Sequence, residues 1–297
     1  MLSIVITSFK EPLIYRAIEA ILHQKISDDY ELIVADPDEK TKKIVDHYKK
    51  NYPQIRYFKD PGKGKSFALN MLFKELKGDI WVFTDGDVFL DNGSINAMVK
   101  QFDDEKMGCV CGRVVCENPR YTLYGYWGKL LADCGAHRIR KELASKGQFL
   151  ECSGYLFAFR NNGVVKEIPL DVAEDSIIPY YFWKRGYKIG YAQNTRVFVK
   201  NPTNMKDWLK QRKRTANAHT KLTYYEPNFP KVKSFKNEVF KGMRWIWGYP
   251  KNLKEFTWTI GLMFVRLYMW ISLYYDLKVK KTGYTDGWER SESTKVQ

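Results

Sequence analysis

Residues 63–87 of this 297-residue chain read KGKSFALNMLFKELKGDIWVFTDGD and decide its fold class. The first part predicts a helix that ends at Gly78, because glycine is common just beyond the last turn of a helix. The apolar run that follows predicts a buried strand, and two carboxylates, Asp85 and Asp87, stand one glycine apart at its end. The stretch is therefore typical of one helix–strand unit in an α/β protein.

The first part of the chain alternates between strand and helix patterns. Strands are predicted at residues 2–8, 30–38, 55–60 and 79–87, and helices at 13–22, 40–52 and 63–78. This order predicts βαβ units and a mostly parallel, Rossmann-like sheet with flanking helices. Ligands of such sheets bind beyond the carboxyl ends of the strands, where Asp36, Asp38, Asp85 and Asp87 fall.

The middle of the chain carries weaker patterns. Residues 155–161 predict a strand, residues 175–185 a helix that ends at Gly186, and residues 205–222 a strongly basic helix. Residues 109–160 mix strand patterns with a helical stretch, and the patterns there predict no order of elements.

The chain is strongly basic, with 49 Lys and Arg against 34 Asp and Glu, a formal net charge of +15 and a pI of about 9.4. This balance favours anionic partners, which include nucleic acids, phosphorylated metabolites and acidic membrane surfaces. The five cysteines lack zinc-binding spacing and predict reduced thiols in a cytosolic compartment. The N-terminal residues predict a strand and not a signal peptide, because they are too short and too uncharged for one.

Residues 258–275, WTIGLMFVRLYMWISLYY, form a nearly uncharged run that is interrupted only by Arg266. A membrane-spanning helix needs about 20 apolar residues, so this run is close to the lower limit. Its aromatic residues and the lysines after it are typical of a membrane interface, and residues 235–254 resemble a helix on a membrane surface. We therefore expect peripheral or single-pass membrane association; a buried helix or an oligomer contact is the alternative.

Two features predict a site for a phosphorylated ligand. Carboxylates one glycine apart suit Mg²⁺ or Mn²⁺, which keep several waters and take other ligands from phosphate. Acidic turn residues after a strand are the alternative. Residues 59–69 combine lysines with small residues before a helix, which is typical of loops that approach phosphates, although they do not form a P-loop sequence.

Five motifs follow one another in chain order: SIVITSFKE, ELIVADPDEKT, GKGKSFALNMLFKELKGDIWVFTDGD, AEDS and QRKRT. Together they resemble the family 2 glycosyltransferases of the GT-A fold, the inverting group that includes cellulose, chitin and hyaluronan synthases and dolichyl-phosphate mannose synthase. The last motif resembles the family's QxxRW motif, with Thr215 in place of tryptophan. We therefore expect a GT-A catalytic domain at residues 1–220, a C-terminal membrane-associated region of amphipathic helices at 221–282 and a disordered tail at 283–297.

The resemblance implies a pocket for the donor, a sugar nucleotide such as GDP-mannose or a UDP-hexose. Thr7, Glu11 and Asp36 would line the part of the pocket that holds the nucleoside. Lys63 or Lys65 would approach the diphosphate.

The resemblance also implies a metal site. Asp85 would contact the ribose or the sugar, and with Asp87 it would bind the Mg²⁺ or Mn²⁺ that bridges the diphosphate. His219 is a candidate third ligand, for which a surface histidine is the alternative.

The reacting groups implied by the resemblance lie later in the chain. Asp175 would be the general base, with Glu174 beside it, and Gln211, Arg212 and Arg214 would lie near the acceptor or the departing diphosphate. The alternatives are a helix N-cap or first-turn acid at Asp175, and a solvated basic helix face for Gln211, Arg212 and Arg214. A carboxylate that takes the proton of the acceptor hydroxyl suits a single displacement with inversion.

The predicted function is transfer of a sugar from a nucleoside-diphosphate sugar to a hydroxyl or phosphate acceptor, lipid-linked or glycan. We expect it at the cytoplasmic face of the cell membrane, with no nucleic-acid partner. The alternative is a non-catalytic basic protein that binds a membrane surface or nucleic acid. A nucleotidyltransferase would need a glycine-rich loop after the first strand, and TSFKEPL is not such a loop.

Overall fold

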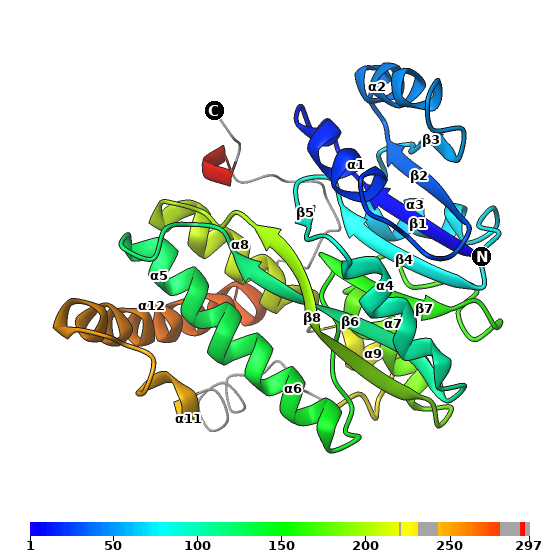
Figure 1. The fold of residues 1–297 in the computed structure, drawn as a ribbon. Helices are drawn as coiled ribbons and strands as arrows, with labels where there is room; N and C mark the ends of the chain where they lie inside the picture. The colour runs from blue at the N-terminus through cyan, green and yellow to red at the C-terminus, as the bar shows by residue number, and fades with distance from the viewer. Residues whose placement is uncertain (220, 231–242, 280–291, 295–297) are drawn as a thin grey trace.

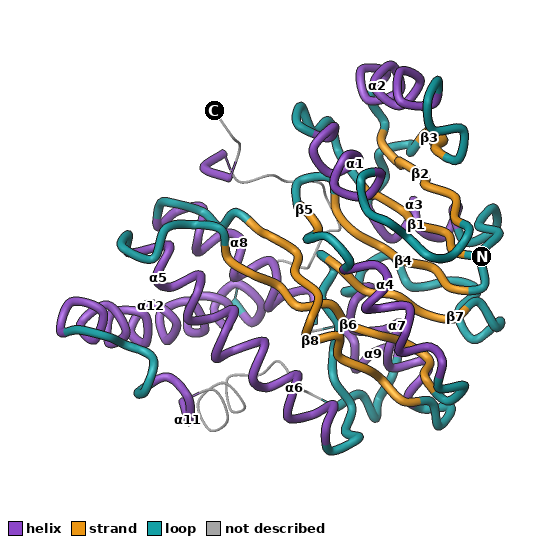
Figure 2. Tube along the Cα trace, viewed as in Figure 1, coloured by secondary structure: helices purple, strands orange, loops and turns teal. Residues whose placement is uncertain are grey.

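The computed structural model describes residues 1–219, 221–230, 243–279 and 292–294. At its centre is one eight-stranded sheet with the strand order β3-β2-β1-β4-β7-β6-β8-β5. Helices flank this sheet, and α5, α8, α11 and α12 lie together on the left of Figure 1, away from the N-terminal strands. The tube in Figure 2 shows the same separation between the strand-rich and the helix-rich parts.

The N-terminal half of the sheet is parallel. Its strands are β1 (Leu2–Thr7), β2 (Tyr30–Asp36), β3 (Ile55–Lys59) and β4 (Ile80–Asp85), and its helices are α1 (Ile14–Leu22), α2 (Glu39–Lys49) and α3 (Lys65–Leu72). β1 pairs in parallel with β2 and β4, and β2 pairs in parallel with β3, so the predicted alternation is confirmed here. Thr7 lies opposite Asp85 in the register, and the carboxyl ends of these strands therefore meet at one edge.

Gly78 does not end a helix as the sequence pattern predicts. Helix α3 ends at Leu72, several residues earlier. A Cβ atom on Gly78 would lie 2.4 Å from the backbone nitrogen of Ser3 and 2.6 Å from the carbonyl carbon of Leu2. The helix-cap prediction is wrong, and the residue is glycine because the chain passes close to β1 there.

The second half of the sheet is mixed. Its strands are β5 (Phe89–Leu90), β6 (Met107–Cys116), β7 (Leu156–Arg160) and β8 (Lys188–Val199). β7 is antiparallel to β4 and β6, β6 is parallel to β8, and β8 is antiparallel to β5. The helices of this half are α4 (Ser94–Val99), a short 3-10 helix (Lys100–Asp103) and α7 (Glu174–Trp183). The strand predicted at 155–161 and the helix predicted at 175–185 are confirmed by β7 and α7.

The strands contribute alternate side chains to two hydrophobic cores, one on each face of the sheet. Val5 and Phe83 belong to a core that includes residues of α3 and α7. Ile4, Ile6 and Val82 belong to a second core that includes residues of α1 and α4. The sheet is thus covered on both faces, which leaves its carboxyl edge as the place for polar groups.

The remaining helices are α5 (Leu123–Leu130), a π-helix (Leu131–His137), α6 (Arg138–Ser145), α8 (Met205–Ala218), α9 (Leu222–Tyr225), α11 (Met243–Ile246) and α12 (Leu253–Lys278). A third hydrophobic cluster joins several of them. Trp127, Trp208 and Leu262 form the centre of the cluster and connect α5, α8 and α12. The predicted basic helix at 205–222 is confirmed by α8, which ends at Ala218.

Three further expectations can be compared with the residues that the structure describes. The five cysteines are free thiols, as expected, and all five are buried, where the sequence predicts only partial burial. Of the predicted surface helix at 235–254, residues 235–242 lie outside the described residues, and the rest forms α11, a turn and the start of α12, so one continuous helix is the wrong prediction there. Most of the predicted disordered tail at 283–297 also lies outside the described residues. Within the tail, Glu292–Thr294 form a 3-10 helix, and the Ser293 amide donates to Asp207 Oδ2 at 2.9 Å. A disordered tail stays a prediction.

Candidate active site

The carboxyl edge of the parallel strands brings the first predicted residues together. The Thr7 hydroxyl, at the end of β1, donates a hydrogen bond of 2.9 Å to Asp85 Oδ1, at the end of β4. The glycine after Asp85 belongs there for a steric reason, because a Cβ atom on Gly86 would lie 2.6 Å from Ile14 Cδ1 and 2.8 Å from Ser8 Cβ. The DGD sequence therefore packs tightly against the loop and helix that follow β1.

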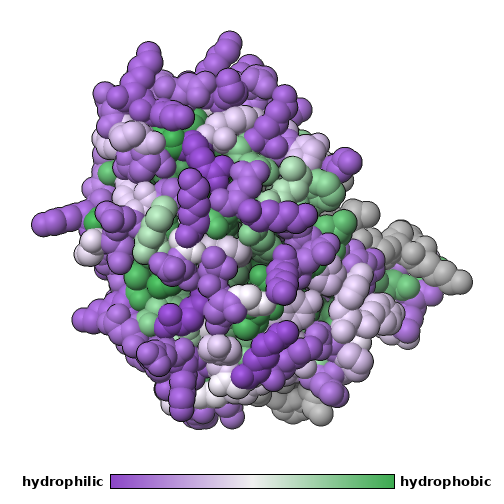
Figure 3. All heavy atoms as spheres, turned by 90° about the vertical axis from the view of Figure 1, so that its right-hand side faces the viewer, coloured by the Kyte–Doolittle hydropathy of each residue, from purple (hydrophilic) through white to green (hydrophobic). Residues whose placement is uncertain are grey.

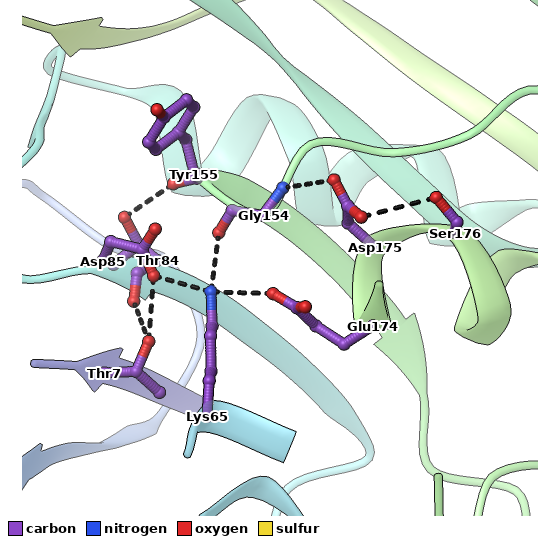
Figure 4. Close-up of polar contacts among 9 residues, drawn as sticks. All are labelled: Thr7, Lys65, Thr84, Asp85, Gly154, Tyr155, Glu174, Asp175 and Ser176. Atoms are coloured by element: carbon purple, nitrogen blue, oxygen red, sulfur yellow. Dashed lines mark hydrogen bonds and ion pairs between the residues drawn. The ribbon is translucent and has the colours of Figure 1, made fainter. Parts of the chain in front are cut away.

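Lys65 is the centre of the site (Figure 4). It is the first residue of α3, and Gly64 before it has a φ of 107°, a left-handed conformation that glycine tolerates. The Lys65 ammonium lies 2.7 Å from Asp85 Oδ1 and 2.9 Å from Glu174 Oε1. It also donates to the Gly154 carbonyl at 3.4 Å. One side chain thus connects the end of β4, the start of α7 and the loop before β7.

The charges around Lys65 shift its protonation. Burial alone would lower the pKa of the Lys65 ammonium, but the carboxylates of Asp85 and Glu174 outweigh burial and raise it. Burial raises the pKa of Asp85, and the neighbouring Asp87 adds to this rise against the opposing effect of Lys65. The lysine therefore remains a fixed positive charge among acidic groups.

Asp175 faces the loop before β7. The first residue of α7 is Glu174, and the N-cap position is Ala173, so the Asp175 carboxylate does not cap the helix. Its Oδ2 accepts a hydrogen bond of 3.1 Å from the Gly154 amide, and its Oδ1 lies 3.4 Å from the Ser176 hydroxyl. Figure 4 shows Asp175 pointing to the Gly154 amide and Glu174 pointing to Lys65, both from α7. The N-cap alternative is therefore wrong for Asp175, which is one of two acids in the first turn of α7.

Gly154 is a site residue that the sequence patterns missed. A Cβ atom on it would lie 3.1 Å from Glu174 Oε1, 3.5 Å from Lys65 Nζ and 4.0 Å from Asp175 Oδ2. The available signal was a glycine directly before a predicted strand, which indicates close approach by another group. Its backbone amide and carbonyl bond to Asp175 and Lys65, respectively.

Tyr155, also missed, lies within electrostatic range of both the acidic edge and α8. Burial raises the pKa of its phenol to about 12, with further increases from the charges of Asp87 and Asp85. Arg212 and Arg214 act on the same phenol in the opposite direction. The two predicted arginines therefore lie within electrostatic range of the same group as the two aspartates.

The α8 residues differ in their surroundings. Arg212 donates to Asn201 Oδ1 at 3.1 Å and lies over the Trp208 ring at 5.6 Å, so it is held in place and is not part of a solvated face. The buried Gln211 side-chain oxygen has no hydrogen-bond partner among the described residues. Arg214 is exposed. The solvated-face alternative is therefore wrong for Arg212.

Asp36 organises the loop that follows β1. Its side chain is fully buried and accepts hydrogen bonds from the amides of Lys10 (3.0 Å) and Asp38 (2.7 Å). Burial raises the pKa of Asp36. Lys10 has a φ of 54°, in the left-handed region, and Asp36 holds this strained turn in place. Asp36 thus sets the shape of the predicted nucleoside pocket, and a direct bond to the base stays a prediction.

Two other predicted residues flank the same edge. Glu11 is buried, and its Oε1 accepts the Leu13 amide at 3.0 Å at the start of α1. Lys63 is exposed and lies over the Phe67 ring at 5.3 Å. Of the two lysines predicted near the diphosphate, Lys65 is the one that points at the carboxylates.

His219 lies in a buried cluster that reaches Asp175 through Ser176, and its side chain is only 8% exposed, so the surface-histidine alternative is wrong. Its Nδ1 lies 3.2 Å from Glu151 Oε2 and 3.2 Å from the Ser176 hydroxyl, which also donates to Glu151 at 2.7 Å. Among the residues that the structure describes, no three or more His, Cys, Asp or Glu side chains form a group that could hold a metal ion. The structure therefore does not bring His219 into one ligand set with Asp85 and Asp87.

Part of the chain matches a family model, and the chain is similar to several curated proteins. Residues 3–160 match the family model described as "Glycosyl transferase family 2". The chain is 26% identical over 261 residues to the probable glycosyltransferase YdaM of Bacillus subtilis, covering 84% of this chain and 60% of YdaM. It is 23% identical over 165 residues to the hyaluronan synthase of Streptococcus pyogenes, covering 51% of this chain and 39% of that enzyme. The chain thus spans only part of the length of these relatives.

Solved structures show the same fold. The mannosyltransferase PcManGT from Pyrobaculum calidifontis, solved with GDP-Man and Mn²⁺, has a TM-score of 0.62 at 17% identity, over 95% of this chain and 88% of that one. S. aureus TarS, solved with UDP-GlcNAc, has a TM-score of 0.53 at 14% identity, over 88% of this chain and 78% of that one. The predicted GT-A fold is confirmed by these likenesses. Because the family model matches more than half of the sequence, the chain belongs to glycosyl transferase family 2.

Proposed function

We propose that this protein transfers a sugar from a nucleoside-diphosphate sugar to a hydroxyl or phosphate group of an acceptor, with inversion at the anomeric carbon. The observation that carries the proposal is the Lys65 ammonium, 2.7 Å from Asp85 and 2.9 Å from Glu174. It joins the acids that the family resemblance assigns to the donor with those that it assigns to proton transfer. Membership of glycosyl transferase family 2 supports the same chemistry.

Asp175 acts as the general base in this proposal. The Gly154 amide holds one of its carboxylate oxygens, which fixes the direction of the side chain. In the displacement, an acceptor hydroxyl gives its proton to Asp175 while its oxygen bonds to the anomeric carbon. The bond from that carbon to the diphosphate breaks in the same step, so no covalent intermediate with the protein is needed.

Positive side chains stabilise the departing diphosphate. Lys65 is a fixed ammonium at the carboxyl edge, and Arg212 is positioned by Asn201 and Trp208. Arg214 adds a second guanidinium in electrostatic range of the same edge. Charges positioned in advance lower the barrier because they require no reorganisation as the leaving group becomes more negative.

The acidic edge fits a divalent cation. Asp85 and Asp87 supply the hard oxygen ligands that Mg²⁺ and Mn²⁺ prefer, and the charge of Asp87 contributes to the raised pKa of Asp85. Such ions take their remaining ligands from water and phosphate, so the diphosphate of the donor would complete the set. When bound, the ion would neutralise charge on the diphosphate.

The donor and the acceptor are inferred from the proteins that this chain is similar to and from helix α12. PcManGT was solved with GDP-Man and TarS with UDP-GlcNAc, which favours GDP-mannose or a UDP-hexose as the donor here. The likeness to hyaluronan synthase and the apolar helix α12 favour a lipid-linked or glycan acceptor at the cytoplasmic face of a membrane. A membrane-bound acceptor reaches the site by diffusion in two dimensions.

Donor binding tests the proposal. Calorimetry against GDP-mannose, UDP-glucose and UDP-N-acetylglucosamine with Mn²⁺ is expected to show saturable binding of at least one donor. EDTA and the Asp87→Ala variant should each weaken that binding by about 10-fold or more, because the diphosphate loses the cation.

The matched control is Asp79→Ala at the opposite end of β4. Asp79 is exposed and pairs with the N-terminal ammonium, so its loss should leave donor affinity unchanged. Donor affinity that is equal in Asp87→Ala, in EDTA and in the untreated protein would remove the metal from the proposal. Steeply salt-dependent oligonucleotide binding without any donor affinity would favour the nucleic-acid alternative instead.

A further inference from the structure

Between its two ends, helix α12 exposes apolar side chains and turns its charged side chains toward the protein, which is the reverse of a surface helix on a soluble protein. Between residues 256 and 274 it exposes six large apolar side chains, at 40% to 69%: Phe256, Phe264, Leu267, Tyr268, Ile271 and Tyr274. We call them the outer face, because at 100° per residue they fall within about a third of the helix circumference. On the surface shown in Figure 3, by contrast, hydrophobic residues are scattered among hydrophilic ones.

The charged residues of α12 lie on the opposite side, toward the protein. Between residues 255 and 276 they are Glu255, Arg266 and Asp276. Glu255 is buried, and Asp276 Oδ2 lies 2.7 Å from Lys213 Nζ on α8. A soluble surface helix has its charges outside and its apolar residues inside, so α12 is built for an apolar medium on its outer side.

Both ends of α12 are attached to the same folded domain. At the N-terminal end, Arg120 bonds to both carboxylate oxygens of Glu255 at 2.8 Å. At the C-terminal end, the ion pair between Lys213 and Asp276 ties the helix to α8. Between them, the Tyr126 hydroxyl lies 2.6 Å from that of Thr259, which fixes the helix along α5.

These attachments restrict the orientation that α12 can take relative to a bilayer. Glu255 and Asp276 are about 30 Å apart along the helix axis, which equals the thickness of the hydrocarbon core. If α12 crossed the membrane, α8 would have to lie beside it in hydrocarbon, with Lys206, Lys210 and Arg214 exposed there. Each such charge is costly in the bilayer.

We infer that α12 lies in the plane of an anionic membrane surface, with its outer face in the boundary between headgroups and acyl chains. The flanking charges complement such a surface, because Lys251, Lys254 and Lys278 are exposed at the two ends of the helix. The tyrosines of the outer face are residues that favour this boundary. The inference specifies the membrane contact and does not depend on the proposed chemistry.

Labelling from one side of a membrane distinguishes the two arrangements. The native cysteines are all buried. Leu253→Cys and Val279→Cys, at exposed positions beyond the two ends of the outer face along the helix, therefore provide selective labels. Each full-length variant is bound to vesicles of phosphatidylcholine with phosphatidylserine and treated with a membrane-impermeant maleimide. We expect equal labelling of both positions from the outside. Labelling of one position only, with the other labelled after lysis of the vesicles, would show a spanning helix and overturn the inference.

A substitution on the outer face tests the contact itself. Ile271→Glu should lower the binding to these vesicles by about 10-fold or more, because a carboxylate replaces an isoleucine side chain in the apolar boundary. The matched control is Leu170→Glu, an exposed leucine away from α12, which should bind as the unsubstituted protein does. Thermal unfolding of both variants checks that the fold is intact, and no sugar nucleotide is present in the assay.

Two other results would contradict the inference. Equal binding to vesicles of phosphatidylcholine alone would show that the membrane contact does not require anionic lipid. Absence of vesicle binding, together with a dimer in light scattering that Ile271→Glu converts to a monomer, would show that a second copy of the chain covers the outer face. Neither result would bear on donor binding, so a failure here is distinguishable from a failure of the proposed function.

Discussion

Replacing Asp175 by asparagine is expected to leave donor binding intact and to lower the rate of sugar transfer by about 10²–10⁴-fold, the range typical of a lost general base. Asparagine keeps the shape of the side chain, and its amide oxygen can still accept the hydrogen bond from the Gly154 amide. It cannot take a proton from an acceptor. Donor affinity and transfer rate measured on one purified variant separate these two effects.

Asp171→Asn is the matched control for this experiment. Asp171 lies shortly before α7 and pairs with Lys221 and Tyr225, outside the Lys65 cluster. Its substitution should leave the transfer rate nearly unchanged. A near-normal rate in Asp175→Asn would contradict the assigned role and direct the search for the base to Glu174.

The second large effect is expected from Lys65→Met, which should lower the free energy of unfolding by about 3–5 kcal/mol, the cost typical of breaking a buried ion pair. The side chains of Lys65, Asp85 and Glu174 are only 12%, 21% and 13% exposed, so little solvent is available to replace the ammonium. Donor affinity should fall as well, because the diphosphate loses a positive charge. Urea unfolding and calorimetry measure the two effects.

The loss of stability in Lys65→Met should depend on pH. Burial already raises the pKa of Asp85, and removal of the ammonium that opposes this rise should raise it further. A carboxyl group whose pKa is raised by folding favours the folded state at pH values below its unfolded pKa. That contribution is lost as the pH rises through the folded pKa. The deficit of the variant should therefore be largest at neutral pH and shrink as the solution is acidified.

Lys63→Met is the matched control for both measurements. Lys63 stands two positions earlier in the same loop and is exposed over Phe67, so its loss should change stability by less than about 0.5 kcal/mol. Equal stabilities of Lys63→Met and Lys65→Met at neutral pH would show that the Lys65 cluster does not stabilise the site.

The parallel half of the fold was predictable because its signals are local. Apolar runs of the length of a strand alternate with helical patterns through residue 87, and parallel strands place their carboxyl ends together. Asp85 and Thr7 therefore meet as expected, although they are 78 positions apart. Lys65 follows from the same logic, because α3 begins at the edge where β4 ends.

The rest of the fold depends on contacts that no local pattern contains. β7 inserts between β4 and β6, so the sheet becomes mixed at a strand whose sequence does not reveal its direction. Gly78 shows the same limit, since the steric contact that requires glycine involves Ser3 and not its own helix. Gly154 is 89 positions from Lys65, and only the folded chain shows that the two meet.

The most direct test of the account is release of nucleoside diphosphate from sugar nucleotides in the presence of Mn²⁺, measured on the unsubstituted protein, on Asp175→Asn and in EDTA. We predict release from at least one donor, a strong loss in EDTA, and a decrease of about 10²-fold or more in Asp175→Asn at unchanged donor affinity. Release that is equal in all three conditions, or a protein that neither binds nor cleaves any of the donors, would contradict the assignment of this site to glycosyl transfer.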